Sequence, residues 1–579
     1  MISDIFEILK VKVATPTGEI WFDVGIIIII ATVFALIARL LKQPLIPAYI
    51  IGGVIIGPIG LGLIKSNEVI TVLSEIGIAF LLFFAGLEIS FKKLKDVTKV
   101  STVAGLAQVF TVGIIASIIA LIFSFSKPEI IFLALAIPFS STAIVAKILA
   151  DRNELNTLHA RIAIGMLLLQ DIIAIIALTV LSTKTLSIEA MLGPLLKVII
   201  LVLFAFLLSK TILKPIFSFA ASSVELLFLT AIAICFLFSL LALLPIAGLP
   251  NLSIVIGSFI AGVLLANSPF KIEIESKVLP LRDFFVTIFF VSIGMQLVLS
   301  GISKQILPLI CFMATVVFIE PYISMIFVRL FGYTKKTSFF AGFFQGQTSE
   351  FSLILMAQGL ALGHVTKSSF SMIVLITVIT MSMTPFFIAN EHFFFSKFSK
   401  VLNILKRLPV KEKVEYITKN KKKIVLFGCH RMGSVFLKAF SKVKDSVIVV
   451  DINPEITKKL TKQNISNIYG DIADPDIINK INFKDIKLAI STVPEKSDNL
   501  FLIERIKEAN PDALIFVTSD HISEALELYK KGADYVILPQ VLGGERGLSF
   551  LKSIIKEKKQ ITKAKEDHIK YLQDLRSFI

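Results

Sequence analysis

The sequence predicts an all-α polytopic membrane domain, followed by a smaller α/β domain with a Rossmann-like fold. The membrane prediction rests on composition, because 55% of the 579 residues are hydrophobic, 49 are Phe, and the mean hydropathy is +0.83. A soluble globular protein does not have this composition. The α/β prediction rests on polar residues that concentrate after position 391 and on short β-rich segments that alternate there with helical patterns.

The membrane half contains about thirteen apolar segments that could each form a helix. Their centres lie near residues 31, 54, 80, 113, 138, 171, 202, 234, 260, 289, 318, 350 and 378. The first segment follows several acidic residues and lacks a small-residue cleavage pattern. We therefore expect a retained helix rather than a signal peptide.

The formal net charge is +16, but many Lys and Arg residues lie in alternate short loops between the apolar segments. This pattern indicates membrane topology rather than nucleic-acid binding, and the positive-inside rule places the N-terminus outside and the C-terminal domain in the cytoplasm. Three Cys residues lie far apart, so we expect neither a disulfide framework nor a resident metal site. The basic loops contain Arg39, Lys42, Lys92, Lys93, Lys95, Lys99, Lys147, Arg152, Arg161, Lys210, Lys214, Lys271, Lys277, Arg282, Arg329, Lys335 and Lys336.

Asp171 is an ionisable residue in the middle of the apolar segment Ile162–Leu181. It lies ten residues beyond Arg161, or about 15 Å along a helix, which is half of the roughly 30 Å hydrocarbon thickness. A carboxylate at that depth usually faces a cavity and marks a pathway for ions or protons, although it could also be held neutral or cap a neighbouring helix. Gln170 offers an oxygen to a cation and an NH2 group to the carboxylate. The pair predicts a cation and proton site.

The membrane half also contains an internal repeat. Pro47–Gly57 recurs loosely as Asn251–Gly262, and Phe83–Glu88 is echoed by Phe289–Gln296. An odd number of spans between the copies would invert the second copy relative to the first. The alternative is that these small residues only form helix-packing faces.

Polar residues interrupt the fifth and twelfth segments, at Pro138–Thr142 and at Gln345–Glu350. Interrupted segments in corresponding positions of two halves indicate a transporter site, because unwound backbone and half-helix ends can bind an ion. Their hydroxyls could instead bond back into their own helices. The candidate transport residues in these breaks are Ser141, Thr142, Gln347, Thr348, Ser349 and Glu350.

The stretch Glu391–Lys423 is basic and rich in Phe, which predicts either an interfacial helix on an anionic membrane surface or a solvated linker. β-rich segments then alternate with helical patterns, as in a doubly wound parallel sheet. The segments are Ile424–Phe427, Val447–Val450, Leu488–Thr492, Ala513–Thr518 and Tyr535–Leu538.

The first of these strands leads into Gly428–Gly433, a Gly-x-Gly-x-x-Gly pattern in which His430 replaces the middle glycine and is expected to narrow access to the phosphates. Asp451 ends the next strand, where an acid can bind a ribose 2′-OH. This favours NAD(H) or an adenine nucleotide over NADP(H). No hydride-acceptor site, catalytic base or second substrate domain accompanies the loop. The sequence therefore predicts a nucleotide that is bound but not turned over.

These membrane residues resemble those of the monovalent cation:proton antiporter-2 family, which includes the Kef potassium efflux systems. The resemblance implies a thirteen-helix dimer, in which a core domain moves like an elevator against a dimerisation domain. A Gln-Asp pair resembles Kef-type proteins, whereas electrogenic sodium antiporters have two acids. The residues that carry the resemblance are Gly86–Glu88, Gln170-Asp171, Gly257–Leu265, Phe289–Gly294 and Gln347–Phe351.

The chain departs from this family at two places. Glu320 stands where many relatives carry a Lys, so we treat Glu320 as a candidate titrating group. The cytoplasmic loop pattern of Kef proteins, His-Ala-Leu-Glu-Ser-Asp-x-Glu-Pro, is matched only at Glu275, Ser276 and Pro280, which leaves glutathione gating open.

The C-terminal half resembles the KTN/RCK (TrkA-N) domain. The residues that carry this resemblance are Tyr469–Asp471, which follow the third strand of that domain, and Gly532–Val536, which lead into its last strand. The resemblance implies that Arg431 contacts a phosphate of the bound nucleotide and that Asp471 contacts its adenosine end. The predicted nucleotide site comprises Gly428, His430, Arg431, Met432, Gly433, Asp451, Asp471 and Thr492.

The resulting hypothesis is a secondary antiporter of the inner membrane, not an enzyme, that exchanges K+ for H+ and is regulated by bound AMP or NAD(H). A Na+/H+ antiporter and a nucleotide-gated K+ channel are the alternatives, although no Thr-x-Gly-Tyr-Gly-like filter occurs. A membrane-bound dehydrogenase is a third option, without substrate-side chemistry to support it. We expect a homodimer in the lipid bilayer that binds no nucleic acid, and we leave open a cytosolic ancillary subunit. The predicted domains are 1–390 (transport), 391–422 (linker), 423–547 (nucleotide binding) and 548–579 (helical tail).

Overall fold

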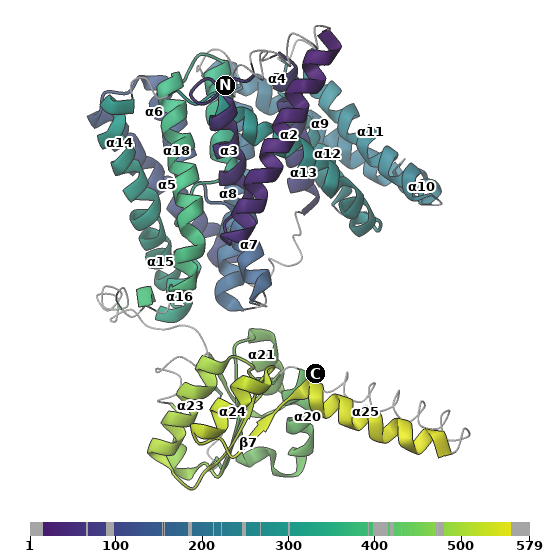
Figure 1. Cartoon of the computed structure of the whole chain (residues 1–579), viewed down its shortest axis with the longest axis vertical. Coiled ribbons are helices and arrows are strands. Elements are labelled where there is room, and N and C mark those ends of the chain that lie inside the picture. The colour runs from purple at the N-terminus through teal and green to yellow at the C-terminus, as the bar shows by residue number, and fades with distance from the viewer. Residues whose placement is uncertain are drawn as a thin grey trace. The chain divides into compact units, whose positions relative to one another are not determined.

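The computed structural model contains two compact units, one made of Met1–Leu155 and His159–Leu408 and the other of Pro409–Ile579 with Asn156–Leu158, and each is described by itself (Figure 1). His430, Asp471, most of the predicted linker and most of the predicted tail lie outside the described residues. The described residues are 16–556 except 65–67, 89–97, 153, 156, 183–187, 212, 222, 246–250, 267, 299–301, 392, 396, 398–414, 417–421, 430, 471 and 473–479.

The first unit is helical, and each of the thirteen predicted segments coincides with a helix or a broken helix in the described part of the chain. Nine of the described helices are long and apolar enough to span a membrane. The predicted polytopic fold is therefore confirmed. The thirteen segments are α2 (Pro16–Leu40), α3 (Leu45–Ile56), α4 (Glu68–Glu88), α5 (Thr98–Ile122), α6 (Lys127–Ala136) with α7 (Thr142–Asp151), α8 (Leu158–Val180), α9 (Ile188–Thr211), α11 (Val224–Leu243), α12 (Ile254–Leu265), α13 (Lys271–Met295), α14 (Ile302–Ala314) continuing through η1 (Thr315–Ile319) into α15 (Glu320–Leu330), α16 (Lys335–Phe343) with α17 (Glu350–Ala361), and α18 (Lys367–Ala389); α10 (Leu213–Ala220) is a short helix between two of these segments.

Both predicted helix breaks are present. Ser141 caps the N-terminus of α7 by accepting a hydrogen bond from the Ile144 N–H at 3.5 Å, and Ser349 caps α17 by accepting one from Phe351 at 3.2 Å. These caps satisfy backbone donors that a helix N-terminus leaves free. The Gln347 amide donates to the Ser141 carbonyl oxygen at 3.4 Å. The two breaks therefore lie against each other.

The repeated small residues bring helix backbones into contact. A Cβ on Gly262 of α12 would lie 2.0 Å from the Phe83 carbonyl oxygen of α4, and one on Gly294 of α13 would lie 2.0 Å from the Ile50 carbonyl oxygen of α3. Close backbone approach at small residues is a common way to pack membrane helices. The small residues thus form packing faces, and each contact joins a helix of the first proposed copy to a helix of the second, while the repeat itself stays a prediction.

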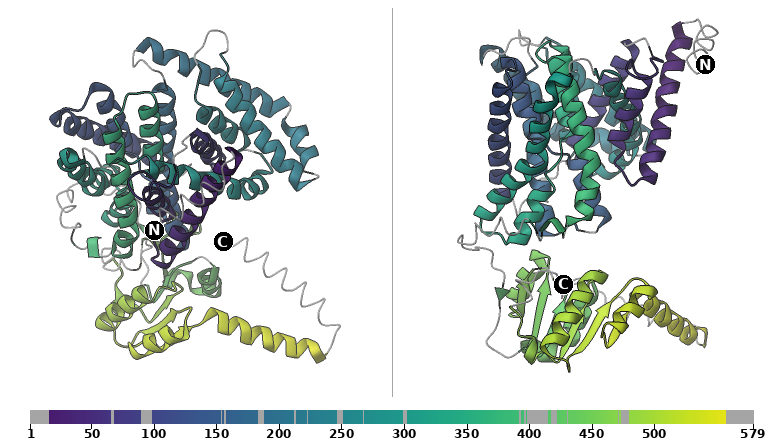
Figure 2. Two further views of the ribbon diagram at one scale, coloured as in Figure 1. Left: turned by 45° about the horizontal axis from the view of Figure 1, so that its top comes forward. Right: turned by 60° about the vertical axis from the view of Figure 1, so that its left-hand side comes forward.

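The membrane helices form two groups, which lie side by side in Figures 1 and 2. The core group contains both broken helices and is made of α5 to α8 and α14 to α18. The scaffold group is made of α2 to α4 and α9 to α13, in which α4 packs against α12 and α13. The apolar clusters follow the same division in large part. The ion-site candidates of both breaks and of α8 belong to the core group.

The second unit contains one seven-stranded sheet in the order β1-β4-β3-β2-β5-β6-β7. All neighbouring strands are parallel except β1 and β4. The five predicted strands and the doubly wound topology are confirmed, and β1 falls within the predicted linker. The strands are β1 (Glu415–Tyr416), β2 (Ile424–Phe427), β3 (Val447–Asp451), β4 (Ser466–Tyr469), β5 (Leu488–Ser491), β6 (Leu514–Thr518) and β7 (Tyr535–Ile537); the α-helices include α20 (Arg431–Ala439), α21 (Pro454–Lys462), α23 (Lys496–Ala509), α24 (Ile522–Lys530) and α25 (Pro539–Lys556).

Candidate functional site

Asp171 is a residue of α8, and its side chain lies beside the N-terminus of the half-helix α7. The Thr142 hydroxyl, on the first residue of α7, donates to the Asp171 Oδ2 at 2.8 Å. The helix dipole places partial positive charge at this end, which favours an anion. Asp171 is half-buried, whereas Gln170 beside it is fully buried. The predicted break and the predicted acid therefore form one site.

Further charges surround Asp171. Glu350, the first residue of α17, and Glu88, the last residue of α4, are close enough to Asp171 to repel its carboxylate. Arg282 on α13 attracts both Glu350 and Glu88, and its guanidinium carbon lies 4.0 Å from the centroid of the Phe84 ring. Two acids of the core group thus face an acid and an arginine of the scaffold group. Such a cluster can concentrate cations near Asp171.

Gln170 belongs to a separate hydrogen-bond network. Its Oε1 accepts from the Ser140 N–H at 3.0 Å, and its Nε2 donates to Gln108 Oε1 at 2.8 Å and to Gln345 Oε1 at 3.1 Å. An amide NH2 has two hydrogens, and both are used here. The prediction that this NH2 serves the Asp171 carboxylate is therefore wrong. Gln170 instead joins α8 to α5 and to both helix breaks.

Glu320 is the acid of that network, not of the Asp171 cluster. Its Oε1 accepts hydrogen bonds from Gln108 Nε2 and Ser140 Oγ, both at 2.8 Å. Its Oε2 is buried and has no hydrogen-bond partner among the described residues. Glu320 directly follows the π-helical turn η1, and such turns are frequent at functional sites. We call Gln108, Ser140, Gln170, Glu320 and Gln345 the crossing network.

The other candidates shape the twelfth segment and the contact between the breaks. The Thr348 hydroxyl lies 2.9 Å from that of Thr377 and 3.2 Å from that of Thr380, which fixes the break to α18. Ser141 and Ser349 act as helix caps, as described above. None of these contacts brings Thr348 to Asp171. Their role as cation ligands stays a prediction.

Gln108, Ser140 and Gln345 were missing from the predicted transport residues. Gln108 is a lone amide within the apolar helix α5, where a buried polar group must find a partner. The sequence shows this lone amide, but it does not show which residues form hydrogen bonds with it. Ser140 and Gln345 lie in the two recognised breaks, so their positions were visible and their bonding was not.

In the second unit the glycine-rich turn has the geometry that its pattern predicts. Gly428 has a φ of +79°, and a Cβ there would lie 2.6 Å from the Thr492 hydroxyl. A Cβ on Gly433 would lie 2.0 Å from the Gly428 carbonyl oxygen. Glycine is therefore required at both places, for the turn and for the close approach of α20 to it. Thr492 donates to the Gly428 carbonyl oxygen at 3.1 Å.

Asp451 links the ends of two strands at this turn. Its Oδ2 accepts from the Cys429 N–H at 2.6 Å, and its Oδ1 accepts from the Asn453 N–H at 2.7 Å. Burial and the neighbouring Asp451 carboxylate raise the pKa of Cys429 to about 12, so this thiol stays protonated and is no nucleophile at neutral pH. Met432 is half-buried at the start of α20. His430, Asp471 and the side chain of Arg431 lie outside the part of the chain that the structure describes.

Two family matches cover the two units. Residues 26–389 match the family described as "Sodium/hydrogen exchanger, transmembrane", and residues 424–539 match the "TrkA-N domain". The first match covers more than half of the chain and includes both helix breaks and Asp171. The second covers the sheet from β2 to β7, with the glycine-rich turn and Asp451.

Individual proteins are similar to this chain over different extents. "K(+) efflux antiporter 4" of Arabidopsis thaliana is 30% identical over 63% of this chain and 62% of its own length. "Putative cation/proton antiporter YbaL" of Escherichia coli K12 is 22% identical over 90% of this chain and 94% of its own. "Glutathione-regulated potassium-efflux system protein KefC" of Escherichia coli O7:K1 is 24% identical over 84% and 77%. The chain thus spans less than two thirds of the plant relative.

Proposed function

The chain belongs to the sodium/hydrogen exchanger family and carries a TrkA-N domain, and on that premise we propose that it exchanges a monovalent cation for protons. The observation that carries the proposal is Asp171, a half-buried carboxylate at the N-terminus of α7 where two broken helices meet. An acid within a membrane span is expensive unless it binds an ion or a proton.

In the proposed cycle, Asp171 holds either one proton or one cation. Both forms neutralise the carboxylate, so both can cross the apolar interior more easily than the empty anion. Thr142 orients the carboxylate, and carbonyl oxygens of the two breaks offer ligands to a cation that has lost water. The crossing network holds the breaks in register through Gln170 and Glu320. Glu350 and Glu88 raise the local cation concentration.

Potassium is the preferred cation in this proposal, and sodium is the alternative. The preference rests on the similar proteins, two of which are named as potassium efflux proteins. A nucleotide-gated channel is less well supported, because the matched family is an exchanger family.

We further propose that the TrkA-N domain binds AMP or NAD(H) and regulates transport without turning the nucleotide over. The turn at Gly428 and Gly433, with Asp451 beside it, supports binding at the N-terminus of α20. By the family resemblance, Arg431 and Asp471 complete the site. A homodimer in the inner membrane, with this domain in the cytoplasm, completes the proposal.

Exchange through one carboxylate is expected to be electroneutral, because one proton replaces one monovalent cation. We expect a K+ gradient to drive proton flux in liposomes containing the purified protein, with little response to a voltage step imposed at zero K+ gradient. Proton fluxes driven by Na+ and Rb+ gradients in the same vesicles rank the cations by rate of exchange. A cation flux driven by voltage would contradict the single-site cycle. Glu320→Gln is the matched variant, since it removes the carboxylate of the crossing network while leaving Asp171 in place.

A further inference from the structure

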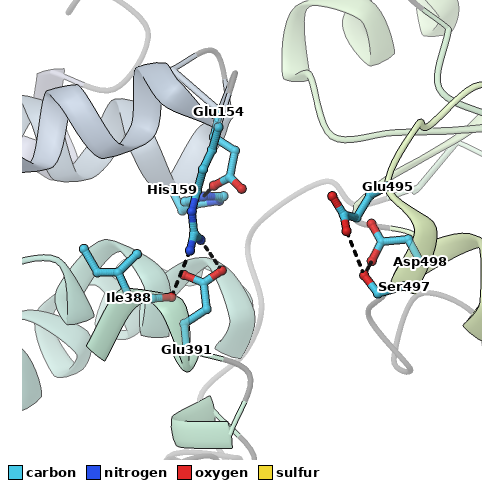
Figure 3. A network of polar contacts seen from close by, with 8 residues as sticks. Glu154, His159, Ile388, Glu391, Glu495, Ser497 and Asp498 are labelled. Carbon is cyan, nitrogen blue, oxygen red and sulfur yellow. Dashed lines mark hydrogen bonds and ion pairs between the residues drawn. The ribbon is translucent and has the colours of Figure 1, made fainter. Parts of the chain in front are cut away.

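The chain that leaves α18 first binds to the far end of α7. Arg152, the C-cap of α7, donates from Nη1 to the Glu391 carboxylate at 2.7 Å and from Nη2 to the Ile388 carbonyl oxygen at 3.0 Å (Figure 3). Glu391 is buried and lies two residues beyond Ala389, the last residue of α18. A charge-assisted pair with a second bond to the backbone is among the stronger polar contacts in proteins. It fixes the end of α7 to the end of α18.

The same segment also binds to α16. The Phe395 ring lies 5.2 Å from that of Phe339, and the Phe394 ring lies 5.6 Å from that of Phe343, measured between centroids. Phe394 and Phe395 pack on an apolar cluster shared by α7, α8 and α16. Aromatic pairs at these separations contribute beyond their buried area. We call Glu391, Phe394 and Phe395 the linker anchor.

The anchored half-helix α7 carries the transport site at its other end, and α16 carries the second break at the end that Phe394 contacts. The helix α7 runs for ten residues from Thr142, which binds Asp171, to Asp151, next to Arg152. The helix α16 ends at Phe343, just before the break that leads to Glu350. A half-helix of ten residues is about 15 Å long and moves as a stiff rod. A shift of the linker anchor would therefore be transmitted along α7 to Thr142, which binds Asp171.

We infer that the linker anchor couples the TrkA-N domain to the ion site, with Arg152 and Glu391 as positioning residues for Asp171. This inference rests on the proposed function. The chain runs from the end of α18 at Ala389 to the TrkA-N domain that begins at residue 424, and the linker anchor is the first part of this connection. A nucleotide that favours one position of the domain then favours one position of α7, to the extent of its differential affinity.

Protonation is expected to tune this coupling. Arg152, Glu154 and Lys336 are the charged groups that act on Glu391, and Glu154 is itself 3.3 Å from His159 Nε2. Burial raises the pKa of Glu391 to about 7, with Arg152 acting in the opposite direction. The carboxyl therefore takes up a proton as the pH falls through about 7, and the ion pair with Arg152 is complete only above that pH.

The test uses the full-length protein in liposomes, with exchange measured in the presence and absence of AMP and of NADH. We expect Glu391→Gln and Arg152→Gln to bring the ratio of the two rates to about one, because the coupling free energy is lost. Nucleotide affinity, measured by calorimetry, should stay unchanged. Arg505→Gln, which alters an exposed pair with Glu508 in the second unit, is the matched control and should keep the wild-type ratio.

A charge-swapped variant, Arg152→Glu with Glu391→Arg, distinguishes loss of the ion pair from misfolding of the single variants. It should restore part of the nucleotide response of exchange. The wild-type response should also decline between pH 8 and pH 6, while that of Glu391→Gln stays flat. A wild-type nucleotide response in both single variants would overturn the inference, as would a wild type that exchanges ions without any nucleotide response. A wild type without exchange would instead contradict the proposed function.

Discussion

Replacing Asp171 with Asn is expected to abolish proton-coupled cation exchange while the protein stays folded. Asn has nearly the same size and can still accept the Thr142 hydrogen bond, but it carries neither a proton nor a charge. Loss of the group that transfers the proton typically costs at least about a hundredfold in rate. Exchange is measured as quenching of a pH-sensitive dye in liposomes after a K+ or Na+ pulse.

The matched control is Glu225→Gln, the same chemical change at an exposed carboxylate of α11, outside the core group. This variant should exchange at the wild-type rate. Thermal unfolding of the two variants in detergent should differ little from that of the wild type, since neither position buries an unpaired group. Normal pH-dependent exchange by Asp171→Asn would rule out the proposed mechanism.

Replacing Asp451 with Asn is expected to weaken AMP and NADH binding by about 10- to 100-fold, because a hydrogen bond to a charged group contributes about 1.5–3 kcal/mol. The nucleotide response of transport should disappear, and basal exchange should persist because it depends on Asp171. Asn is preferable to Ala here, since its amide oxygen can keep one of the two hydrogen bonds that the carboxylate accepts from the Cys429 and Asn453 N–H groups. Calorimetry measures the affinities.

Asp445→Asn serves as its control, because Asp445 lies exposed just before β3. Its nucleotide affinity should equal that of the wild type. The wild type should leave NADH chemically unchanged during incubation, as followed by absorbance. Equal affinities in Asp451→Asn and the wild type would count against the ribose role of Asp451. Steady NADH oxidation would count against regulation without turnover.

The sequence predicted the membrane fold because its signals are local. Each span is an apolar run, and the polar residues inside two runs mark the places where helices break, as at Ser141 and Ser349. The partner of Gln170 could not be predicted, because neighbouring helical residues point about 100° apart. Asp171 therefore faces one set of helices and Gln170 another. Which helices these are depends on tertiary packing.

Glu320 shows the same limit. Its place in the sequence marked it as unusual, but its contacts with Gln108 and Ser140 join segments that are 212 and 180 residues away. The glycine-rich turn was easier to predict, because the local backbone geometry requires glycine at positions Gly428 and Gly433. The bond from Cys429 to Asp451 depends on two parallel strands lying side by side, and the motif alone does not specify it.

Competition between a proton and a cation for Asp171 is the central claim, and proton release on cation binding tests it most directly. Purified protein in weakly buffered detergent solution is titrated with KCl, and the pH change is compared with the heat of binding. Choline chloride provides the ionic-strength control. The account predicts release of up to about one proton per bound cation in the wild type, and none in Asp171→Asn. Cation binding without proton release, or equal release by both proteins, would contradict it.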